Sequence, residues 1–531
     1  MSERGSRRPG RLCAALVAIG LLGCGRDSGK RGETIFRRLE GEPKTLNALL
    51  ATGDPDLTVL ALVSRNLLDY DASLMLVPGL AESVVPDASR LKYTVTLRPD
   101  AMWEDGTKVT ADDVVFTLET LVDPKTPALN RRGFFEGFEK AERLDERTAR
   151  VSFRTASSTR LDAFSLPLLP AARYRGTNLG SNPLNRAPLS NGPYRLARWV
   201  AGSSIELERN PRASGSPGGA DRFLFRIVPE SAAAFEALRT GALDEVRLTQ
   251  PQYLEIDRAK GDVRAVLWND LSYTYIGWNN RLPLFESPGV RRALTQLIDR
   301  EGISRALYGG LARPANGPLP PGLWPYDVTL EPIAFDPMAA AAALDAAGFR
   351  RGRDGVRKKG GVRFAFSLSL GAGSDVQRQI AETIQQAFRT AGVEMTLRPM
   401  EWAAFSSAVD GGSFEACFLA MSLDPNPDLF QSWHSSQVPP NGWNSVFYAN
   451  PRVDALIEKL RDTFDREKAR PLYAEIQRLI RDDEPVTFLH YVPVKWGVNR
   501  RIEGVATSPI GLSLFWPGAA SWRTVRSKSP V

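Results

Sequence analysis

Residues 363–398 read RFAFSLSLGAGSDVQRQIAETIQQAFRTAGVEMTLR and predict a strand, a helix and a second strand in succession. The first eight residues alternate between apolar and polar side chains, which indicates a half-buried strand. Apolar residues then recur at helical spacing, at Val376, Ile380, Ile384 and Phe388. Gly392 ends the predicted helix, and residues 393–398 form the next predicted strand. This β-α-β order implies a parallel sheet.

The chain then enters residues 400–435, which read MEWAAFSSAVDGGSFEACFLAMSLDPNPDLFQSWHS. An apolar run at residues 414–421 predicts a strand that leads directly to Asp424 and the prolines after it. Ligand clefts of open α/β sheets lie at the carboxyl ends of strands. We therefore hypothesise that Asp424 and Trp402 help to form a ligand cleft. The alternative is that Asp424 is only a turn or helix-cap residue, as is common for Asp-Pro.

Length and composition indicate an ordinary globular protein of several domains. At roughly 150 residues per domain, 531 residues correspond to two to four domains or two large lobes. Hydrophobic residues make up 43% and charged residues 24%, which is typical of globular chains with a full core. The net charge of +7 is mild for this length, and basic runs do not interleave with aromatic residues. The composition therefore speaks against nucleic-acid binding.

The N-terminus has the pattern of a secretory signal. Basic residues precede an apolar run at residues 12–22, which is too short to span a bilayer. The sequence Leu21-Leu22-Gly23-Cys24 resembles the bacterial lipobox. That resemblance implies that residues 1–23 are removed and that Cys24 carries lipid as the first mature residue. Residues 24–33, which are polar and rich in glycine, then form a tether; the alternative is a plain signal peptide.

The residues that enzymes use are scarce. Cys417, in an apolar run, would be the only unmodified cysteine of the mature chain, so we predict a buried thiol and no disulfide. The only histidines are His434, expected in a solvated loop with contact to a ligand as the alternative, and His490, expected in the core. No HExxH, CxxC, GxSxG or GxxxxGK[ST] motif occurs. We therefore predict no catalytic residues, no metal site, no cofactor and no enzyme activity. Acid pairs alone can hydrolyse glycosides, so a secreted hydrolase stays open.

A series of short, distinct motifs follows in order along the chain. They are Leu91–Arg98 with Trp103–Gly106 and Thr110–Val114, then Asn191–Tyr194, Glu208–Pro211, Gly241–Asp244, Asn279-Asn280, Val290–Leu294, Ile298–Arg300, Asp336-Pro337 and Ala346–Gly348. In this order they resemble the family-5 solute-binding proteins of ABC transporters, which include dipeptide and oligopeptide receptors. Glu104 stands where histidine is common in the family.

The resemblance implies a type-II periplasmic-binding-protein fold of class α/β, in which two hinged lobes close on a ligand. Peptide-binding members carry an extra N-terminal domain. We expect lobe 1 at residues 34–70 with 190–284 and 503–531, the extra domain at 71–189 and lobe 2 at 285–502. The hinge strands are expected near residues 279–288 and 497–504.

The resemblance also implies roles for three residues of the cleft. Asp424 matches an acid that pairs with a peptide's α-ammonium group, and Trp402 matches an indole of the cleft wall. Met421 stands where relatives often have tryptophan, so the ligand could differ there. A buried ammonium requires a fixed anion. Main-chain hydrogen bonds to an extended peptide would tolerate many sequences.

The function implied is that of an extracytoplasmic receptor, held at the periplasmic or cell-surface side by lipid on Cys24. It would act as a monomer and deliver peptides to the permease complex of an ABC importer. The alternatives are a receptor of the same fold for a nickel chelate, haem, an oligosaccharide or an opine-like compound, the secreted hydrolase, and a lipoprotein that only scaffolds or signals.

Overall fold

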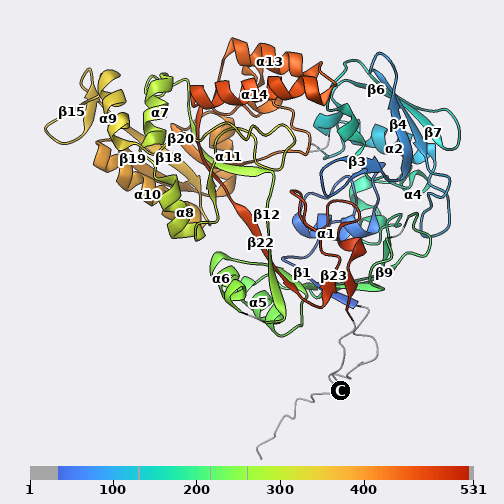
Figure 1. Ribbon diagram of the computed structural model, residues 1–531. Coiled ribbons are helices and arrows are strands. Elements are labelled where there is room, and N and C mark those ends of the chain that lie inside the picture. Colours follow the sequence, from blue (N-terminus) through green and yellow to red (C-terminus); the bar gives the residue numbers. More distant parts are fainter. Residues whose placement is uncertain (1–33, 129–131, 216, 260, 526–531) are drawn as a thin grey trace, which may run out of the picture.

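The computed structural model describes residues 34–128, 132–215, 217–259 and 261–525 (Figure 1). The predicted signal peptide, Cys24 and the tether lie outside these residues. Among the residues described, no helix has both the length and the apolar character needed to cross a membrane.

A seven-stranded mixed sheet forms the first lobe. Its strands, in spatial order, are β12 (Val263–Asn269), β22 (Pro493–Asn499), β11 (Glu245–Arg247), β1 (Thr34–Leu39), β10 (Arg222–Ile227), β9 (Ser204–Arg209) and β8 (Tyr194–Val200). β1 runs parallel to both of its neighbours, and the other pairs are antiparallel. The helices of this lobe are α1 (Asp54–Val63), α5 (Ser231–Arg239) and α6 (Gln250–Arg258).

A six-stranded sheet forms the second lobe. Its order is β14 (Arg313–Pro314), β21 (Val486–Tyr491), β13 (Ser272–Trp278), β20 (Ala416–Ser422), β18 (Ala365–Gly371) and β19 (Glu394–Met400). β18 is parallel to β19 and to β20, as the β-α-β pattern predicts. The helices are α7 (Pro288–Gln296), α8 (Arg300–Tyr308), α9 (Pro337–Ala346), α10 (Asp375–Ala391), α11 (Trp402–Asp410), α12 (Phe430–Trp433), α13 (Pro451–Arg461) and α14 (Arg466–Asp483). A small sheet of β15 (Arg350–Arg351), β16 (Arg357–Lys359) and β17 (Val362–Arg363) lies at the outer end of this lobe (Figure 1).

Both faces of the second sheet are buried. Along β13, Ile276 and Trp278 belong to one hydrophobic cluster with Ile380 of α10, whereas Tyr273 belongs to another with Ile476 of α14. Side chains along a strand point alternately to the two faces of its sheet, so this division places helices on both faces. α10 ends at Gly392 as predicted, and this glycine adopts a left-handed conformation (φ 83°). At its start, Ser374 accepts from the Gln377 backbone N–H.

A third unit adjoins the first lobe. Its four-stranded antiparallel sheet has the order β4 (Ala81–Pro86), β5 (Lys92–Leu97), β7 (Thr148–Phe153) and β6 (Phe138–Arg143), and its helices are α2 (Ala111–Val122) and α4 (Ala171–Tyr174). Thr110 and Asp113 form a capping box at the start of α2. The hairpin of β2 (Leu68–Tyr70) and β3 (Leu76–Pro78) leads into this unit, while β23 (Ile502–Glu503) and β24 (Arg523–Thr524) pair near the C-terminus. The unit shares one continuous core with the first lobe, from Ile35 through Val151 to Trp522.

The chain crosses between the two large sheets twice. It leaves the first sheet at the end of β12 and enters the second at β13, and it returns from β21 to β22 through Val492. Figure 1 shows β12 and β22 running together between the lobes. The crossings therefore lie at residues 269–272 and 491–493, and not near residues 279–288 and 497–504, where they were expected. β13 pairs with β20 and β21, so residues 272–278, expected in lobe 1, belong to the second sheet. β22, expected in lobe 2, pairs with β11 and β12 in the first sheet. The division into lobes that close on a ligand stays a prediction.

Candidate ligand cleft

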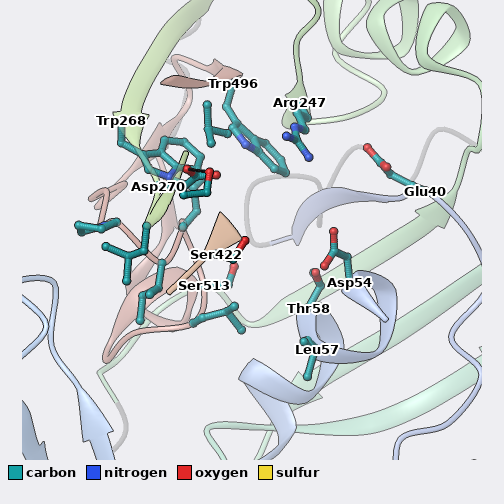
Figure 2. A pocket seen from close by; sticks show the side chains of 18 of the residues that line it. Glu40, Asp54, Leu57, Thr58, Arg247, Trp268, Asp270, Ser422, Trp496 and Ser513 are labelled. Carbon is teal, nitrogen blue, oxygen red and sulfur yellow. Dashed lines mark hydrogen bonds between the residues drawn. The ribbon is translucent and has the colours of Figure 1, made fainter. Parts of the chain in front are cut away.

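A cleft of about 470 Å³ lies where the two large sheets meet (Figure 2). Its walls come from β1, α1 and β11 of the first lobe, from both crossing segments, and from the start of the loop after β20. The C-terminal loop at residues 509–514 closes one side. Small-molecule sites commonly occupy such positions between domains and have volumes of about 300–1,000 Å³. The architecture thus offers a ligand site between the lobes.

Asp424 follows directly after two cleft-lining residues, Ser422 and Leu423. Its side chain is accessible to solvent, yet it forms no hydrogen bond or ion pair with any residue that the structure describes. Surrounding protein raises the pKa of the Asp424 carboxyl to about 6, chiefly by desolvation and secondly by repulsion from Asp162. An accessible but poorly solvated carboxylate without a cation is suited to receive one from a ligand.

Asp162 brings a second carboxyl group to this region from the third unit. Tyr70 donates its hydroxyl to Asp162 Oδ1 (2.6 Å), and the Asn426 amide donates to Oδ2 (2.9 Å). Burial raises the pKa of Asp162, while these two donors lower it. Asp162 and Asn426 also line a smaller cavity of about 230 Å³ beside α13 and α14. Asp424 therefore stands in sequence between residues that line two separate cavities.

Trp402 and Met421 have different surroundings. Trp402 begins α11 and leaves 63% of its surface exposed, at the edge where the parallel strands β18 and β19 end. Met421 is half buried and packs against the cluster that contains Tyr273 and Phe488. Neither of these residues, nor Asp424 itself, is among those that line the 470 Å³ cleft. The roles predicted for Asp424, Trp402 and Met421 in ligand binding stay predictions.

The cleft also contains residues that the sequence analysis missed. Arg247 and Trp496 occupy facing positions on β11 and β22, while Trp268 and Asp270 come from the end of β12 and the crossing after it. Figure 2 shows these side chains around the cavity. Trp268 and Trp496 stack with ring centroids 6.2 Å apart. Trp268 and Trp496 could have indicated the cleft from the sequence, because both lie on the strands next to the crossings. This indication could be used only once those strands were known.

The buried cysteine and histidines follow simple packing rules. Cys417 is fully buried, as predicted, and burial raises the pKa of its thiol to about 12. His490 is fully buried, as predicted; its Nε2 lies 2.7 Å from the Arg300 carbonyl oxygen, and burial lowers its pKa to about 4. The prediction for His434 is wrong. The residue is 8% exposed, and its ring packs on Phe430 of the short α12.

Several motif residues have structural roles. Asn280 donates its side-chain amide to the carbonyl oxygens of Trp278, Val446 and Pro485. Asp244 is fully buried, accepts from the Phe36 backbone N–H (2.7 Å) and pairs with Arg501. Within the described part of the chain, no group of three or more His, Cys, Asp or Glu side chains could hold a metal ion.

Known proteins of similar sequence and similar overall structure exist. Oligopeptide-binding protein AppA of Bacillus subtilis is 28% identical over 480 residues, which cover 88% of each chain. Its solved structure, in complex with a nonapeptide, has a TM-score of 0.75 and 26% identity, and the match covers 94% of this chain and all of that one. NikZ of Campylobacter jejuni, solved in complex with Ni(L-His), has a TM-score of 0.77 and 25% identity, covering 93% of this chain and all of NikZ.

These structures have the type-II periplasmic-binding-protein fold, so the fold class inferred from the motifs is confirmed. The family described as bacterial extracellular solute-binding proteins, family 5, matches residues 75–443, well over half of the chain. The family consists of solute-binding proteins rather than enzymes. The chain belongs to the bacterial extracellular solute-binding proteins of family 5.

Proposed function

We propose that this protein is the extracytoplasmic receptor of an ABC importer and that it captures peptides between its two lobes. The observation that carries the proposal is the Asp424 carboxylate just after β20, which is accessible, poorly solvated and without a partner among the residues described. A peptide's α-ammonium group would supply the missing cation through a charge-assisted hydrogen bond. The likeness to a relative solved with a nonapeptide supports the same ligand class.

The proposal includes the protein's place in the cell. Lipid on Cys24 would hold it at the outer side of a membrane, and residues 24–33 would tether the lobes there. As a monomer it would release its ligand to the permease complex. The division into two lobes, with the third unit at residues 71–189, fits closure about β12 and β22. None of these steps uses a catalytic group, which is why we propose a receptor and not a hydrolase.

A ligand screen tests the ligand class. The purified protein is heated with pools of peptides, with oligosaccharides, with haem and with nickel–histidine complexes, and carried-over ligand is identified by mass spectrometry. Peptides at a 100-fold excess over Kd should stabilise the fold by about 2.7 kcal/mol. Stabilisation by Ni(L-His) alone would favour the alternative function, a receptor of the same fold for a nickel chelate, which the likeness to NikZ supports. Turnover of any ligand would instead favour the alternative that the protein is a secreted hydrolase.

A variant tests the role of Asp424. Asp424→Asn keeps the shape of the side chain and removes its charge, so peptides with a free N-terminus should lose roughly tenfold or more in affinity. N-acetylated forms of the same peptides lack the ammonium group and should bind the variant and the unmodified protein equally. Isothermal titration calorimetry measures both series. Equal losses for the two series would reject the ammonium-binding role.

A further inference from the structure

Three arginines line the cleft, and two of them are already engaged. Arg37 donates to Glu245 (2.8 Å) and to Ser513 Oγ (2.9 Å). Arg38 donates to the Val228 and Pro229 carbonyl oxygens and pairs with Glu40. Arg247 is exposed and forms no hydrogen bond or ion pair with any residue in the described ranges. Its guanidinium group is thus the cleft cation whose charge the described protein groups leave unneutralised.

Trp496 is the cross-strand neighbour of Arg247. The two residues face each other in the antiparallel pairing of β11 with β22, so their side chains lie on the same face of the first sheet. Cβ atoms at such positions are about 4.5–5.5 Å apart. The Trp496 indole Nε1–H is buried and has no acceptor among the described residues. A buried donor without an acceptor is costly, and Trp496 lines the cleft, so an acceptor on a ligand would satisfy this donor.

We propose that Arg247 and the Trp496 Nε1–H together bind the carboxylate of a zwitterionic ligand, with the stacked Trp268 ring beside it. A guanidinium group presents parallel N–H donors that match the two oxygens of a carboxylate, and the indole adds a further donor. Figure 2 shows Arg247, Trp496 and Trp268 around one cavity. This inference rests on the proposed function, because it names the second charged end of the peptide.

The remaining charges of the cleft limit where a ligand anion can lie. Asp54 at the start of α1 and Asp270 at the crossing would repel it, and Glu40 stands beside Arg38. The position next to Arg247 and Trp496 combines a positive charge with an unpaired donor. It belongs to the first lobe, whereas Asp424 belongs to the second. A ligand with an ammonium group on Asp424 and a carboxylate on Arg247 would therefore hold both lobes together in the closed form.

The experiment compares peptides that differ only at the C-terminus. Pools of random tripeptides, hexapeptides and nonapeptides, as free acids or as C-terminal amides, are titrated into the purified protein by calorimetry. The unmodified protein should bind the acids at least tenfold more tightly than the amides. Arg247→Gln should remove this preference by weakening the acids alone, and Trp496→Phe, which keeps a ring but loses the N–H, should reduce it about threefold.

Arg198→Gln serves as the matched control, because Arg198 is also exposed on this sheet but lies on β8 at its far edge. It should leave both affinities unchanged. Equal binding of acids and amides by the unmodified protein would overturn the inference and leave the receptor proposal standing; this comparison needs no variant to fold. Equal weakening of acids and amides by Arg247→Gln would also overturn it. If no peptide binds in either form, both proposals fail.

Discussion

Two acids of the second lobe have raised pKa values for the same reason but stand in opposite surroundings. Desolvation by the surrounding protein raises the pKa of Glu484 to about 7 and that of Asp424 to about 6. Glu484 is fully buried and accepts a hydrogen bond from Thr295, which also bonds Thr487. Asp424 is accessible and has no partner among the described residues. A shifted pKa alone therefore does not distinguish a structural acid from a candidate ligand-binding acid; accessibility and the presence of a protein partner do.

The largest expected effect is a difference in the free energy of unfolding between variants of Glu484 and of Asp424. At pH 5, Glu484→Ala should lower the free energy of unfolding by about 3 kcal/mol, because it leaves a cavity and removes the acceptor of a buried hydroxyl. Asp424→Asn should change the same quantity by less than about 1 kcal/mol, since no protein contact is lost. Urea unfolding followed by circular dichroism measures both. A comparable loss in the two variants would show that Asp424 has a structural role.

The pH dependence of stability sharpens the comparison next. A carboxyl group whose pKa is about 7 when folded and 4.5 when unfolded binds its proton more tightly in the folded state. Its stabilisation is complete below pH 4.5 and is lost as the pH rises towards 7. Relative to Glu484→Gln, the unmodified protein should lose roughly 2 to 3 kcal/mol between pH 4.5 and 8. Parallel unfolding curves across this range would contradict the burial of Glu484.

Asp424 should instead show its titration in ligand binding. With a pKa of about 6, the carboxyl group is mostly charged at pH 7 and mostly neutral at pH 5. The affinity for a peptide with a free N-terminus should therefore fall about tenfold from pH 7 to pH 5. Asp424→Asn should be insensitive to pH over the same range. Calorimetry of both proteins at pH 5, 6 and 7 checks this, and an equal slope in the variant would assign the titration to another group.

Local patterns predicted the elements of the second lobe well. Three local patterns agree with the structure because tertiary packing did not override them. They are the alternation at residues 363–370, the helical spacing from Val376 to Phe388 and the helix end at Gly392. Such patterns cannot say which sheet a strand joins. The side chains of β13 would alternate in either sheet, so the sequence could not assign this strand to a lobe. The crossing was therefore expected too late in the chain.

The site was only partly predictable for the same reason. Asp424 and Trp402 stand at the ends of a β-α-β stretch, where the topology of α/β sheets itself points to a cleft. Arg247 and Trp496 are far apart in sequence and become neighbours only through the pairing of β11 with β22. His434 was misplaced because its burial depends on the turn after the four-residue α12. Contacts of this kind require the tertiary structure.

The smallest expected effect distinguishes Trp402 from Met421. Trp402→Ala should weaken peptide binding about threefold to tenfold if the indole forms a cleft wall, because one aromatic contact contributes about 1 kcal/mol. It should leave the free energy of unfolding within about 0.5 kcal/mol, since 63% of the side chain is exposed. Met421→Leu preserves an apolar side chain of similar volume against the Tyr273 cluster and should change neither quantity measurably. A loss of affinity in Met421→Leu without a loss in Trp402→Ala would place the ligand against Met421 rather than against Trp402.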